Sequence, residues 1–255
     1  MSLVELVVGF GVALMIGLTG VGGGTLTVPI LVLFLGTPVA EAVGTALLFS
    51  ALVKIPAALL YLWQRRVDFG VLKSMLLGGV PGVVLGAVLL GRFQEGRMRD
   101  VVLIVVGLTI GATAAFNLWR LVRGNGERGT VPHPRFLPWL TLVIGVEVGF
   151  SSAGAGALGT LILLGCTTLA PAVVVGTDLA FGLTLSAVGG GLHLGLGHWS
   201  PTLLQALVLG GVPGAVLGAR LATVLPARSL RAALLVWLVV LGGQLLQRGA
   251  AALFQ

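Results

Sequence analysis

Two glycine-rich stretches hold the residues best suited to bind a small anion. Residues 17–24 contain five glycines, and residues 149–156 contain three glycines and two serines. Each interior glycine costs a helix about 1 kcal/mol relative to alanine, so we expect both helices to break there. Breaks expose backbone N–H groups and helix N-termini, which attract negative charge. The predicted anion-binding groups are Thr19, Gly22, Gly23, Gly24, Thr25, Ser151, Ser152, Gly154 and Gly156. The alternative is that these glycines only allow helices to pack closely.

Ionisable side chains inside apolar segments form a second group of candidates, because charge in a membrane is costly. Lys54 is predicted to balance the charge of the anion, although it could instead extend toward the membrane surface. Thr45 and Thr177 are predicted hydroxyl donors to the same anion. Asp178 or Glu147 would carry a coupling proton.

The elements that position these residues belong to a duplicated unit. Residues 78–87 return 132 residues later as 210–219 with one change, and the pair Gly44-Thr45 falls on Gly176-Thr177 at the same offset. We therefore expect a first repeat over 1–122, an inter-repeat loop over 123–135 and a second repeat over 136–255. Together the repeats would form one integrated membrane domain.

Composition sets the class of fold. Of the 255 residues, 57% are hydrophobic and 9% are charged, and several apolar runs reach the length of about 20 residues that crosses a bilayer. Lipid offers no hydrogen-bond partners, and these runs lack the alternation of a barrel strand. The sequence thus predicts an all-α polytopic membrane protein. The net charge of +7 comes from basic residues at the ends of apolar runs, which indicates topology signals and not nucleic-acid binding.

Metal and cofactor chemistry is not expected. Cys166 is the single cysteine, which excludes an internal disulfide and a multi-cysteine metal site. An HExxH motif, paired carboxylates on one helix and a Cys/His cluster are all missing from the sequence. The sequence therefore predicts a protein that is not an enzyme and that has no cofactor.

Each repeat is predicted to contain five helices, of which the first two are short. The expected ranges are 2–18, 25–36, 38–62, 67–91, 99–122, 136–151, 157–167, 170–195, 200–223 and 229–248. The short pair could be one broken crossing, which makes the repeats parallel, or a re-entrant hairpin, which inverts the second repeat. In the hairpin arrangement ten basic residues lie on one side of the membrane and four on the other. In the broken-crossing arrangement the numbers are eight and six. The positive-inside rule favours the hairpin and the inverted repeat, with both termini outside.

The order of these motifs resembles that of the TauE/SafE sulfite exporter family. The resemblance rests on the glycine-rich break followed by Val28-Pro29, the two Gly-Thr pairs, the repeated Gly-Gly-Val-Pro-Gly and the two-fold layout, and it covers nearly the whole chain. It implies a bacterial inner-membrane transporter of small sulfur-containing or organic anions such as sulfite, sulfoacetate or thiosulfate.

The leading hypothesis is a secondary transporter, expected to export its substrate, with one central anion site between the two breaks. A passive anion channel and a membrane enzyme acting on lipid-linked anions are the alternatives. The expected partners are the small anion, the lipid bilayer and a coupling proton. A homodimer is left open, and nucleic acid is not expected.

Overall fold

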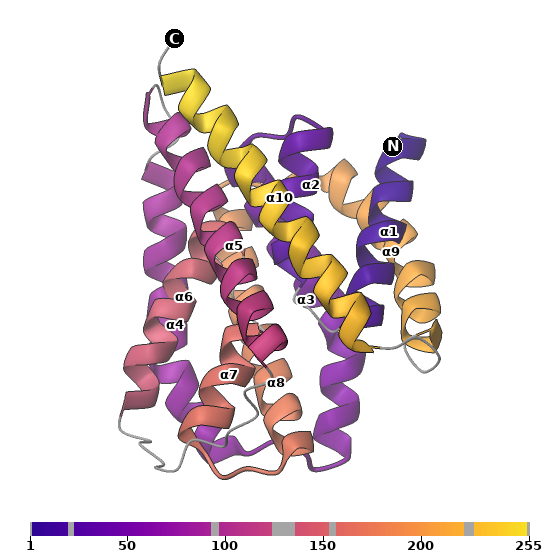
Figure 1. Cartoon of the computed structure of the whole chain (residues 1–255), viewed down its shortest axis with the longest axis vertical. Coiled ribbons are helices and arrows are strands. Elements are labelled where there is room, and N and C mark those ends of the chain that lie inside the picture. The colour runs from indigo at the N-terminus through magenta and orange to yellow at the C-terminus, as the bar shows by residue number, and fades with distance from the viewer. Residues whose placement is uncertain are drawn as a thin grey trace.

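The computed structural model describes residues 2–19, 23–92, 97–123, 136–152, 157–221 and 227–253, and its regular elements are all helices (Figure 1). In chain order they are α1 (Leu3–Thr19), α2 (Gly23–Phe34), α3 (Val39–Trp63), α4 (Phe69–Arg92), α5 (Arg97–Arg123), α6 (Leu137–Ser151), α7 (Ala157–Cys166), α8 (Pro171–Gly195), α9 (Pro201–Leu221) and α10 (Ala227–Leu253). The predicted all-α class is confirmed. The predicted helix ends agree to within about two residues, except that α10 continues past 248 through three alanines, the best helix formers.

Six of the described helices are long and apolar enough to cross a membrane: α3, α4, α5, α8, α9 and α10. The remaining four are shorter, and α2 and α7 have only 12 and 10 residues. Twelve helical residues span about 18 Å, whereas a hydrocarbon core is about 30 Å thick. The chain is therefore a multi-pass membrane protein, and α2 and α7 are too short to cross alone.

The two short helices lie toward opposite ends of the molecule. Figure 1 shows α2 near the end at which the N- and C-termini are marked, and α7 near the other end. Each short helix follows a helix of intermediate length, α1 with 17 residues and α6 with 15. The pairs α1–α2 and α6–α7 thus occupy opposite sides of the bundle.

Contacts between the two halves follow the 132-residue offset. The most extensive helix pairs are α4 with α6, α1 with α9, α5 with α10 and α3 with α8. Each of these pairs joins a helix from the first half to a helix from the second. The α4–α6 pair corresponds to α9–α1, while α5–α10 and α3–α8 each correspond to themselves. The duplication seen in the sequence therefore reappears as duplicated packing.

Glycines make the α4–α6 and α9–α1 contacts possible. A Cβ atom on Gly82 would overlap the carbonyl oxygen of Leu142, and one on Gly214 would overlap that of Phe10. These are the same contact at the 132-residue offset. Small residues let helix backbones approach closely where lipid provides no hydrophobic drive between helices. The repeated Gly-Gly-Val-Pro-Gly is thus a packing face.

The central pair α3 and α8 runs antiparallel. A Cβ atom on Gly44 would lie 2.8 Å from the Cβ of His193, one on Gly190 would lie 2.9 Å from Leu48, and one on Gly176 would lie 2.9 Å from Tyr61. As the residue numbers rise along α3, those of the contacted residues in α8 fall. The self-corresponding pair α3–α8 therefore packs antiparallel along its length.

The glycine contacts give a first prediction. Gly82→Ala should lower the free energy of unfolding by about 1–3 kcal/mol, because the new methyl group forces α4 and α6 apart. Thermal unfolding of the purified protein in detergent measures the change. Gly243→Ala on α10 is the matched control, since a Cβ atom there meets nothing within 4 Å. Equal loss of stability in both variants would contradict the packing role.

Candidate functional site

The two glycine-rich breaks meet inside the protein. Ser152 follows the last residue of α6 in the left-handed backbone region, with φ 60°. Gly24 is the second residue of α2, and a Cβ atom placed on it would overlap both the carbonyl oxygen and the hydroxyl of Ser152. Because only glycine fits this contact, the end of α6 rests directly on the first turn of α2.

The predicted break residues lie where α1 and α6 end and α2 begins. Thr19 ends α1, Gly23 begins α2, and Thr25 is buried in the first turn of α2. Gly22, Gly154 and Gly156 lie outside the described residues. The described part of the two breaks therefore forms one buried region between the halves.

The two serines that end α6 differ in their hydrogen bonds. Ser151 donates its hydroxyl to the backbone carbonyl of Glu147 at 2.9 Å, within the same helix. The Ser152 hydroxyl is buried and has no hydrogen-bond partner among the described residues, and the residue is only 5% exposed. A buried hydroxyl without a partner is costly, so the unused hydrogen-bonding capacity of Ser152 makes it a candidate ligand-binding group.

Lys54 lies at the interface of α3 and α8. Its side chain is buried, and its ammonium group donates a hydrogen bond of 3.2 Å to the hydroxyl of Ser186. Ser186 in turn donates to Ser50 at 3.4 Å. Lys54 and Ser186 are equivalent positions at the 132-residue offset, so this hydrogen bond joins a position to its own counterpart. A buried basic side chain thus lies between α3 and α8.

Asp178 lies against the first turn of α7. Its Oδ2 accepts a hydrogen bond of 2.6 Å from the hydroxyl of Thr160, and its Oδ1 abuts Gly159. The residue is 5% exposed, and Oδ1 has no hydrogen-bond partner among the described residues. Asp178 is also close enough to Lys54 for the two charges to attract each other. A helix N-terminus carries partial positive charge, which further favours this carboxylate.

Glu147 occupies a different place. Its carboxylate accepts a hydrogen bond of 2.7 Å from the hydroxyl of Thr113 on α5. The described contacts of Asp178 are instead with α7 and with Lys54 on α3. The structure therefore does not gather the two predicted coupling carboxylates into one cluster among the described residues, and Asp178 is the one beside the central lysine.

Thr45 and Thr177 face the connections that follow the opposite repeat's central helix. The hydroxyl of Thr45 accepts a hydrogen bond of 3.1 Å from the backbone N–H of Ser200, and that of Thr177 accepts one of 3.0 Å from Asp68. These two bonds are equivalent at the 132-residue offset. Both threonines are fully buried, so each holds the turn beyond the end of its neighbouring helix.

Several polar residues of this region were not predicted from the sequence. Thr160, Thr113 and Ser50 are ordinary residues of apolar helices, and their partners lie on other helices. His193, for which the sequence favours a capping or interfacial role over a proton relay, is fully buried, and its Nε2 lies 3.2 Å from the carbonyl oxygen of Gly149, a hydrogen bond in the tautomer protonated at Nε2. Sequence spacing alone carries no signal for these contacts, because they depend on how the helices are rotated.

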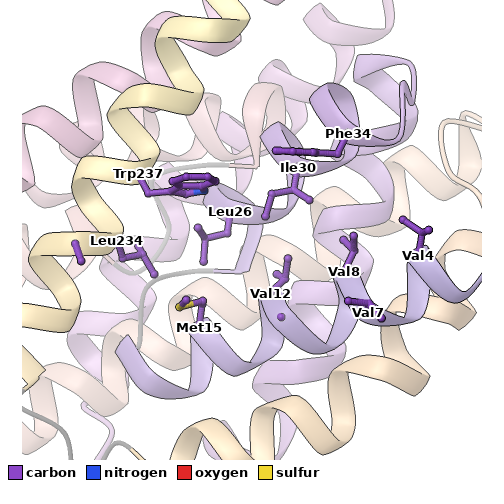
Figure 2. A pocket seen from close by; sticks show the side chains of 12 residues that line it. Val4, Val7, Val8, Val12, Met15, Leu26, Ile30, Phe34, Leu234 and Trp237 are labelled. Atoms are coloured by element: carbon purple, nitrogen blue, oxygen red, sulfur yellow. The ribbon is translucent and has the colours of Figure 1, made fainter.

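A cavity of about 650 Å³ lies between α1, α2 and α10 (Figure 2). Figure 2 shows Val12 and Met15 of α1 facing Leu26 and Ile30 of α2, with Trp237 of α10 beside them. The lining side chains are apolar and carry no charge. Such a surface does not suit a small anion, so this cavity is not the predicted site.

Comparisons with known proteins agree with this architecture. The chain matches the family model described as sulfite exporter TauE/SafE over residues 5–245. It is 28% identical over 240 residues to the probable membrane transporter protein YjnA of Bacillus subtilis (strain 168), covering 87% of this chain and 90% of that protein. It is 26% identical over 270 residues to the probable membrane transporter protein YunE of the same organism, covering 98% of this chain and 99% of that protein.

A third relative is matched over a shorter region. A probable membrane transporter protein of Xylella fastidiosa (strain 9a5c) is 32% identical over 104 residues, which is 41% of this chain and 39% of that protein. No solved structure matches the chain significantly. The helical membrane architecture and these relatives define a membrane transporter. Because the family model covers nearly the whole chain, the protein belongs to the TauE/SafE sulfite exporter family.

The threonine contacts give a second prediction. Thr45→Val and Thr177→Val should each lower the free energy of unfolding by about 1–3 kcal/mol, because a backbone N–H group loses its partner. Thermal unfolding in detergent again measures the loss. Thr184→Val is the control, since that hydroxyl donates to the Ala180 carbonyl of its own helix. If all three variants unfold at the same temperature, the two threonines do not hold the connections.

Proposed function

We propose that the protein exports small sulfur-containing or organic anions, such as sulfite, sulfoacetate or thiosulfate, across the bacterial inner membrane. The observation that carries this proposal is the contact between Gly24 and Ser152, which joins the two helix breaks within the protein. The family to which the chain belongs supports sulfite as a substrate. The printed names of its relatives support transport and name no substrate.

The chemistry of the region suits an anion. The N-terminal ends of α2 and α7 present backbone N–H groups and partial positive charge, as discontinuous helices do at the midplane sites of transporters. The hydroxyl of Ser152 adds a donor against the first turn of α2, and the ammonium group of Lys54 adds a positive charge at the interface of α3 and α8. Glycine at position 24 leaves room for backbone approach.

An inverted repeat would give this site two equivalent routes of access. The antiparallel α3–α8 pair and the placement of α2 and α7 toward opposite ends support opposite orientations of the two halves. The helix order supports a division between α5 and α6, with repeats proposed over 1–122 and 136–255, while α5 extends to Arg123 and most of the proposed loop over 123–135 lies outside the described residues. In this proposal each re-entrant pair closes the site from one side, and rocking of one half about the other alternates the access.

Asp178 is the proposed carrier of a coupling proton, because it is buried beside Lys54 and the end of α7. Glu147 is the second candidate, although its described contact is with Thr113 on α5. Protonation of Asp178 would remove a negative charge from the neighbourhood of the substrate. Proton movement and anion movement would then be linked electrostatically.

A ligand panel tests the function directly. Sulfite, thiosulfate, sulfoacetate, sulfate and short carboxylates would each be added to the purified protein and its thermal unfolding recorded. A true substrate at about 100 times its dissociation constant should stabilise the protein by about 2.7 kcal/mol. In proteoliposomes the same anion should show saturable flux and counterflow. Linear flux without counterflow would indicate a channel, and flux insensitive to a pH gradient would contradict proton coupling.

Lys54 gives a further prediction. Lys54→Ala should weaken sulfite binding by roughly 10- to 100-fold, because loss of the buried positive charge leaves the carboxylate of Asp178 uncompensated and makes the region less favourable for an anion. Lys73→Ala is the control, because Lys73 is an exposed lysine of α4. Isothermal titration of both variants with sulfite gives the dissociation constants. Wild-type affinity in Lys54→Ala would remove this residue from the site.

A further inference from the structure

We propose that Asp178 is a built-in anion that occupies the N-terminal end of α7, and that the transported anion binds at the equivalent end of α2, beside Ser152. This inference rests on the proposed function, because it assumes that the two breaks serve an anion. The inference places the transported anion at the end of α2 alone, where the proposed function allows the ends of both α2 and α7. The argument depends on how the two repeats differ at equivalent positions.

The end of α7 already holds a negative charge. The carboxylate of Asp178 touches Gly159 in the first turn of α7 and accepts a hydrogen bond of 2.6 Å from the hydroxyl of Thr160. Gly159 leaves room for this contact, because a Cβ atom there would overlap Oδ1. Lys54 lies near enough to balance the charge. A second anion at this end would meet the carboxylate and be repelled.

The equivalent position at α2 carries no charge. At the 132-residue offset Ala46 replaces Asp178, Ser186 replaces Lys54, and Thr27 replaces Gly159. Ala46 is fully buried in α3, a helix that packs against α2. Since the first N–H groups of a helix have no partner within the helix, the end of α2 keeps its partial positive charge without a protein carboxylate at this position.

Ser152 independently marks the end of α2 as a binding place. Its hydroxyl is buried, has no hydrogen-bond partner among the described residues, and lies against Gly24 in the first turn of α2. A hydroxyl in this position can donate a hydrogen bond to an anion that also accepts hydrogen bonds from the N–H groups at the end of the helix.

The decisive variant introduces an aspartate into the first repeat, at the position equivalent to Asp178. The double substitution Thr27→Gly with Ala46→Asp reproduces at α2 the glycine and carboxylate found at α7. Its matched control is Thr27→Gly with Ala46→Asn, which has nearly the same shape and no charge. Sulfite binding is measured by isothermal titration on the purified full-length proteins in detergent.

The aspartate variant should bind sulfite about 100-fold more weakly or worse, because placing like charges together costs several kcal/mol. The asparagine control should stay within about threefold of the wild type. Equal affinities in the two double variants would overturn the inference while leaving the proposed function standing. If the wild-type protein binds none of the panel anions, that result contradicts the proposed function itself.

Two further variants keep the test decisive if the double variant does not fold. Ser152→Ala should weaken sulfite binding about tenfold through the lost donor, while Ser74→Ala on α4 should not. Asp178→Ala should raise the binding stoichiometry from one sulfite per chain toward two, since the end of α7 becomes vacant. Unchanged affinity in Ser152→Ala together with unchanged stoichiometry in Asp178→Ala would overturn the inference.

Discussion

The architecture depends on one constraint: a backbone that leaves the helix inside a membrane must find its hydrogen-bond partners within the protein. The chain meets this constraint by bringing its two broken segments together, with the end of α6 resting on the first turn of α2 at Ser152 and Gly24. The spans α3 and α8 pack against each other. Neither repeat on its own contains both sides of this contact, so the halves are needed together.

Glycine packing holds the two halves at the distance that this contact requires. The glycine faces of α4 and α9 press against the backbones of α6 and α1, which are the helices that lead into the breaks. A larger residue at Gly82 or Gly214 would move α6 or α1 and thereby the break at its end. The position of the candidate site therefore depends on the glycine contacts that both repeats share.

Within this nearly symmetric frame, the charges are not symmetric. Lys54 and Asp178 have the neutral equivalents Ser186 and Ala46, so one helix end has a protein carboxylate beside a lysine and the other has neither. A duplicated scaffold supplies two similar helix ends, and a pair of substitutions makes them chemically different. The cavity between α1, α2 and α10 has no charged residue in its lining.

The sequence by itself determined the helices, the duplication and the position of the breaks. These features are local, since apolar runs, glycines and a fixed offset can be recognised from neighbouring residues alone. The partners of the polar side chains were decided only by the tertiary structure: Thr45 and Thr177 bind the connections at Ser200 and Asp68, and Glu147 faces α5. Such contacts depend on the rotation and pairing of helices from opposite halves, which no local pattern in the chain specifies.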